Sequence, residues 1–63
     1  MIKLTKLSGV EFVVNSDLIE FIEVLPDTTI SMTTGKKIIV KEDIEDVVNK
    51  IMEFKSDVYT KIK

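Results

Sequence analysis

The 63-residue chain contains no cysteine and no histidine. The absence of cysteine excludes disulfide bonds and thiolate metal sites, and it is compatible with a reducing compartment. The absence of histidine removes the commonest zinc ligand and the commonest general base near neutral pH. Serine and threonine are plentiful, but no histidine is present to activate their hydroxyl groups. We therefore expect neither an enzyme nor a cofactor.

Arginine is also missing, so that all nine basic residues are lysines, and the formal net charge is −2. Lysine cannot form the two-pronged hydrogen bonds with which arginine recognises phosphate and guanine, which argues against nucleic-acid binding. No apolar run approaches the roughly 18 residues of a membrane span. The first residues lack the apolar region of a signal peptide. These absences favour a cytoplasmic protein that binds other proteins.

The alternation of apolar and polar residues predicts about five short strands within residues 2–41, followed by one helix over residues 43–61. We expect a single domain over residues 1–63 of the α+β class, with one small antiparallel sheet. Turns at Gly9, Asn15, Pro26 and Gly35 separate the strands, because these residue types favour tight turns. The expected strands are residues 2–7, 10–14, 18–25, 28–34 and 37–41.

The third expected strand, residues 18–25, fits neither a strand period nor a helical period cleanly. A helix would place four of its apolar residues on one face, namely Leu18, Phe21, Ile22 and Leu25. The flanking strands and the following Pro26 favour a strand instead. Such a strand is either apolar on both faces or interrupted by a β-bulge, and its outer face should be partly covered.

The helix has the most consistent local pattern, because Asp43 is a suitable N-cap and acidic residues follow it in the first turn. We predict that the helix is amphipathic, with its apolar side chains on an arc of about 160°. The arc contains Ile44, Val47, Val48, Ile51, Met52, Phe54, Val58, Tyr59 and Ile62.

The helix is longer than the strands that it would cover. It spans roughly 28 Å, whereas a six-residue strand spans about 20 Å, so its last one or two turns should extend past the sheet. Lys55 interrupts the apolar arc near this point. It either extends its ammonium group to solvent at the rim of the sheet or marks the place where a partner begins. The candidate contact with an oligomeric partner therefore consists of Phe54, Lys55, Val58, Tyr59 and Ile62. The alternative is that the whole arc covers the sheet.

Lys3, Lys37 and Lys41 are expected on the outward face of the sheet. One interpretation is a small basic patch that contacts an acidic partner or an anionic lipid surface. The other interpretation is that lysines on edge strands prevent edge-to-edge aggregation.

Several short segments carry a resemblance through their order and spacing. They are IKLTKLSG (residues 2–9), NSDLIEFIE (15–23), PDT (26–28), TGKK (34–37) and VKE (40–42). In these segments the chain resembles the FlbD family of small flagellar proteins, called SwrD in swarming bacteria. The resemblance covers nearly the whole chain and includes the turn residues Gly9, Asn15, Pro26, Asp27 and Gly35. Lys6 and Asp43 depart from the pattern, since relatives often carry arginine and serine there.

The resemblance implies an accessory protein that supports flagellar motor power and swarming motility. It implies a protein partner in the motor, with the stator as the supposed target, and a place at the cytoplasmic side of the motor. We expect a homo-oligomer, because so short a chain can bury only a small core. The alternative function is a small RNA-binding post-transcriptional regulator similar to the carbon storage regulator. Those regulators read RNA with arginine near the start of the helix, where this chain has Glu42 and Asp43.

Overall fold

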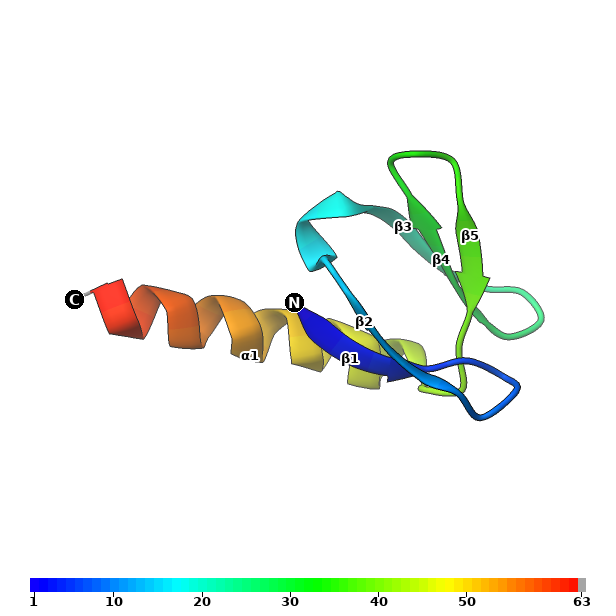
Figure 1. Cartoon of the computed structure of the whole chain (residues 1–63), viewed down its shortest axis with the longest axis horizontal. Helices are drawn as coiled ribbons and strands as arrows, with labels where there is room; N and C mark the ends of the chain where they lie inside the picture. Colours follow the sequence, from blue (N-terminus) through cyan, green and yellow to red (C-terminus); the bar gives the residue numbers. More distant parts are fainter. Residues whose placement is uncertain (63) are drawn as a thin grey trace.

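The computed structural model describes the backbone of residues 1–62 and the side chains of residues 1–55. The chain forms five strands and a C-terminal helix, as predicted, and each strand is shorter than its expected range (Figure 1). In chain order the elements are β1 (Ile2–Thr5), β2 (Glu11–Val14), the 3₁₀ helix η1 (Ser16–Leu18), β3 (Ile19–Val24), β4 (Thr28–Met32), β5 (Lys37–Ile39) and α1 (Ile44–Ile62).

The prediction of one sheet was wrong, because the strands form two antiparallel sheets, β1–β2 and β3–β4–β5. The change of direction occurs at η1. The Asn15 side chain accepts a hydrogen bond from the backbone N–H of Asp17 at 3.0 Å and caps this short helix. The turn redirects the chain after β2, so that β3 begins a second sheet instead of extending the first (Figure 1).

The structure confirms that residues 18–25 contain a strand, and a register shift between Ile19 and Phe21 marks the β-bulge. Beyond the bulge, Ile22 lies opposite Ile30, and Ile30 lies opposite Ile38. These three side chains share the face that points to the core. Phe21 lies on the other face and is 58% exposed, so the described residues leave this ring largely open to solvent.

The core lies between the two sheets and the first half of α1. It draws on β1, β2, β4 and α1 and on Val40, which follows β5. Its buried members are Ile2, Leu4, Val14, Ile30, Val40 and Val47. The two sheets meet at one corner, where Lys6 and Val40 form an isolated β-bridge.

A carboxylate reinforces this corner. Glu42 accepts two hydrogen bonds from Thr5, one from the backbone N–H to Oε1 and one from Oγ1 to Oε2, each at 2.9 Å. Burial raises the pKa of Glu42, but the hydrogen bonds and the charge of Lys50 outweigh this effect, so that the pKa lies below its ordinary value. The ionised carboxylate therefore holds the end of β1 against the segment that leads into α1.

The helix α1 begins where the sequence predicts. Asp43 precedes its first residue, and the Asp43 carbonyl accepts the first helical hydrogen bond from the N–H of Val47 at 3.1 Å. Val47 is fully buried, and Ile51 and Phe54 pack against the core on the same side. Figure 1 shows α1 running alongside β1 and then past the strands, as its length predicts. Only its first part covers the sheets.

Candidate protein-binding surfaces

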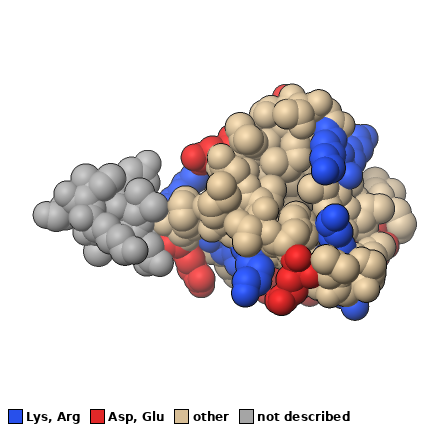
Figure 2. All heavy atoms as spheres, viewed as in Figure 1, with Lys and Arg blue, Asp and Glu red and all other residues tan. Residues whose placement is uncertain are grey.

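Many large apolar side chains of this chain are exposed. Among residues 1–55, six apolar side chains are buried, whereas eleven large ones are exposed. Figure 2 shows wide areas without charge between the lysine and acidic side chains on one face. Scattered apolar residues are normal on a protein surface, but groups of them mark binding surfaces. Two such groups are formed by the described residues.

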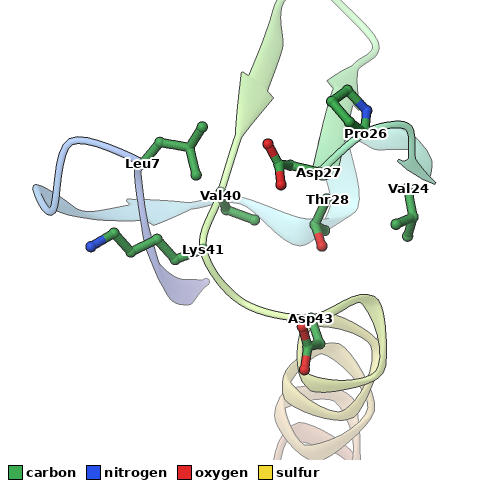
Figure 3. Close-up of a pocket in the computed structure, with 8 residues that line it drawn as sticks. All are labelled: Leu7, Val24, Pro26, Asp27, Thr28, Val40, Lys41 and Asp43. Carbon is green, nitrogen blue, oxygen red and sulfur yellow. The ribbon is translucent and has the colours of Figure 1, made fainter.

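The first group surrounds a groove at the corner where the β1–β2 hairpin, the β3–β4 turn and residues 40–43 meet (Figure 3). The groove has a volume of about 420 Å³. It combines apolar side chains with two carboxylates and one lysine. We call it the corner groove, and its lining consists of Leu7, Val24, Pro26, Asp27, Thr28, Val40, Lys41 and Asp43.

Two turns present the apolar rim of the corner groove. The β1–β2 hairpin closes with a hydrogen bond of 2.8 Å from the N–H of Gly9 to the carbonyl of Lys6. Gly9 has a φ of +94°, a conformation that favours glycine, and the turn leaves Leu7 48% exposed. Beside the β3–β4 turn, Val24 is 52% exposed at the end of β3. These exposed side chains are available to a partner because the turns hold them away from the core.

The charged groups of the corner groove make it acidic. In Figure 3 the Asp27 carboxylate points toward the middle of the group, whereas the Lys41 side chain extends away from the other residues. Asp43 lies at the side of the groove where α1 begins. The groove therefore suits an apolar side chain accompanied by a positive charge.

The second group lies on α1, beside the side that packs against the core. Ile44 is half-buried, Val48 and Met52 are 40% and 63% exposed, and Lys55 is exposed. Their spacing of three or four residues places them along one line of the helix. A shallow hollow of about 330 Å³ lies on this line and is lined by Ile44, Glu45, Val48 and Asn49. We call Ile44, Val48, Met52 and Lys55 the free row.

The predicted oligomer contact is only partly described. Phe54 is half-buried and packs against the core, so it contributes to the fold. Lys55 is exposed. The side chains of Val58, Tyr59 and Ile62 lie outside the described residues. The sequence alone does not separate Val48 and Met52 from the core-facing residues, because all of them fall within one apolar arc.

The three lysines of the predicted basic patch are exposed but belong to different elements. Lys3 is on β1, Lys37 is on β5, and Lys41 borders the corner groove. Lys6 lies over the ring of Phe12, with 5.6 Å between Nζ and the ring centroid. The three lysines are thus distributed over two sheets and a connecting segment. Whether they act together as a basic patch stays a prediction.

The turn residues singled out in the sequence divide into two groups. Gly9 and Gly35 adopt φ values of +94° and +92°, and Asn15 caps η1, so these residues shape the fold. Pro26 and Asp27 line the corner groove. Pro26 and Asp27 thus connect a sequence motif to a candidate binding surface.

Two other kinds of site are absent from the described part of the chain. It contains no group of three or more acidic side chains placed to hold a metal ion. Among these residues, no helix combines the length and the apolar character that crossing a membrane requires.

Comparison with known protein families identifies the family of this chain. The model of the FlbD family, described as flagellar and swarming motility proteins, matches residues 1–59. Neither a curated protein nor a solved structure matches the chain. The matched residues include the whole corner groove and the whole free row.

Proposed function

Because the chain belongs to the FlbD family of flagellar and swarming motility proteins, we propose that it is a flagellar accessory protein that acts by binding other proteins. Its proposed role is to support the power of the flagellar motor from the cytoplasmic side. The proposed target is the stator, which is the partner that the family resemblance implies.

The exposure of apolar side chains at the corner groove is the observation that supports a binding role. Leu7 and Val24 are 48% and 52% exposed around a concave surface that also carries carboxylates. Exposing these side chains to water is unfavourable by about 25 cal/mol per Å² of apolar surface. A partner that covers them recovers this free energy, so the groove is suited to binding.

The charge of the corner groove narrows the kind of partner. We propose that the groove receives a protein segment in which an apolar side chain stands next to lysine or arginine. The apolar side chain would contact Leu7 and Val24, and the positive charge would lie near Asp27 and Asp43. Opposite charges at the rim of an interface mainly raise the association rate and the specificity.

Deleting the gene and recording the torque of single motors in tethered cells tests the proposal. We expect a normal number of flagella and a reduced torque. Complementation with Leu7→Ser should leave the torque low, because Leu7 is exposed and its loss removes groove surface without disturbing the core. Val10→Ser is the matched control, since Val10 is 57% exposed on the same hairpin but does not line the groove. Fewer flagella in the deletion strain would contradict a motor role and favour action on flagellar gene expression.

A further inference from the structure

We propose that α1 pairs with α1 of a second copy of this chain in antiparallel orientation, with the free row of each helix against the free row of the other. This inference rests on the proposed protein-binding function and names a second copy as one of the partners. The free row is available because the core uses a different side of α1. Val47, Ile51 and Phe54 face the core, whereas Val48 and Met52 lie on average about 110° away around the helix axis.

The sequence continues the free row to the end of α1. After Lys55 the same spacing of three and four residues reaches Tyr59 and Ile62, and α1 itself extends to Ile62. The complete line is Ile44, Val48, Met52, Lys55, Tyr59 and Ile62. Such a line is the seam along which two helices pack.

The positions along this line are nearly symmetric about its centre. Residues 44 and 62, 48 and 59, and 52 and 55 lie at matching distances on either side of the middle of α1. An antiparallel partner therefore places its Ile62 beside Ile44, its Tyr59 beside Val48, and its Lys55 beside Met52. The hollow at Ile44 and Val48 lies where the end of the second helix would contact the first.

Charge decides between the two orientations. Glu45 is in the first turn of α1 and lines the hollow beside the free row, whereas Lys61 and Lys63 stand at the other end of the sequence. An antiparallel pair places the acidic end of each helix beside the basic end of the other, and it also aligns the helix dipoles favourably. A parallel pair would bring acidic first turns together and lysines together.

Lys55 is the one charged member of the row. In the antiparallel pair its aliphatic stem lies along Met52 of the second copy, while its ammonium group reaches solvent at the rim. A lysine within a helix seam weakens the pair but restricts the registers that it can adopt. The pair is therefore weaker than a fully apolar seam and more specific in its alignment.

Cysteine crosslinking tests the orientation, because the natural chain contains no cysteine. We expect that Val48→Cys chains mixed with Tyr59→Cys chains form a covalent heterodimer on mild oxidation. Val48→Cys alone should not crosslink, since the two positions 48 would be about 16 Å apart in the antiparallel pair, and a disulfide needs about 4 Å between Cβ atoms. The matched control is Asp46→Cys with Thr60→Cys, which have the same axial alignment but lie on the opposite side of α1.

Each outcome of this experiment has a definite meaning. Crosslinking of Val48→Cys with itself would indicate a parallel pair, and crosslinking of the control pair would indicate non-specific contact; either result would overturn the proposal. A monomer in sedimentation at 100 µM, roughly the concentration at which a weak specific dimer becomes visible, would overturn it as well. These measurements use purified protein, so they are independent of the torque assay, and each proposal can fail without the other.

A pair of substitutions tests the proposed contact between Met52 of one copy and Lys55 of the other. Lys55→Met should lower the dissociation constant of the dimer, and Met52→Lys should raise it by about tenfold, because each changes the number of charged side chains along the seam. Both side chains are exposed in the single chain, so the fold should be retained in each variant. Unchanged dissociation constants in both variants would overturn the proposal.

Discussion

Glu42 and Thr5 show how a single side chain can join two parts of this small fold. They are separated by 37 residues, and their two hydrogen bonds connect the first strand to the start of the helix. Thr5 also accepts a backbone hydrogen bond from Lys41 at 2.8 Å, so both polar groups of its backbone are used at this corner. The Glu42 carboxylate therefore adds a link between the two sheets at the end of β1.

Replacing this carboxylate by an amide should weaken the corner. We expect Glu42→Gln to lower the free energy of unfolding at pH 7 by about 1 kcal/mol, because hydrogen bonds to a charged acceptor are stronger than those to a neutral one and partial exposure limits the loss. Urea denaturation of both proteins measures the difference. Glu23→Gln serves as the control, since Glu23 is exposed on β3.

The effect of Glu42 should depend on pH in one direction. Its pKa is lowered in the folded protein from an ordinary value of 4.5, so its stabilising contribution is complete above that value. The contribution is lost as the pH falls through the pKa of the folded state. The difference between the wild type and Glu42→Gln should therefore be smaller at pH 3 than at pH 7. An equal difference at both pH values would contradict a role for the charge.

At the scale of the element, two neighbouring residues of α1 have different roles. Val47 is fully buried, whereas Val48 is 40% exposed on the free row. We expect Val47→Ala to lower the free energy of unfolding by about 2 kcal/mol, because it removes buried methyl groups and leaves a cavity. Val48→Ala should change it by less than about 0.5 kcal/mol. Urea denaturation, at a concentration where the chain is monomeric, measures the free energy of unfolding of both variants. Equal decreases would refute the assignment of Val47 to the core side of α1 and of Val48 to its exposed side.

At the scale of the whole molecule, the core that the structure describes extends along the chain as far as Phe54. Among the described side chains, the buried ones lie between Ile2 and Val47, and Phe54 is the last that packs against this core. Isolated helices of this length are marginal in water, so the stability of α1 comes from packing of its first half. The remainder of α1 extends past the strands (Figure 1).

A chain that ends after Lys55 should therefore fold but lose self-association. We expect its free energy of unfolding to stay within about 1 kcal/mol of the full chain, because it keeps every core residue of the described part of the chain. Circular dichroism during urea denaturation and analytical sedimentation measure the two properties separately. A loss of cooperative unfolding would show that the end of α1 is needed for the fold. Retained dimerisation would place the self-contact elsewhere.

The sequence by itself determined the order and type of the elements. Alternation of apolar residues predicts the strands, Gly9, Asn15 and Gly35 predict turns that the structure contains, and Asp43 predicts the start of the helix. These predictions succeed because hydrogen-bonding and conformational preferences of a residue act on its near neighbours along the chain. The register shift in β3 agrees with one of the two alternatives that the sequence leaves open for a segment whose residues fit no regular period.

Only the tertiary structure decided how these elements meet. It divided the strands between two sheets, brought Glu42 to Thr5, and assembled the corner groove from three distant segments. It also separated the apolar arc of α1 into a side that faces the core and a free row. A local pattern can show that a side chain is apolar, but the position of β1 and β3 against α1 determines whether that side chain is buried. Contacts between distant segments depend on the packing of the whole chain, and that packing leaves the groove and the free row exposed.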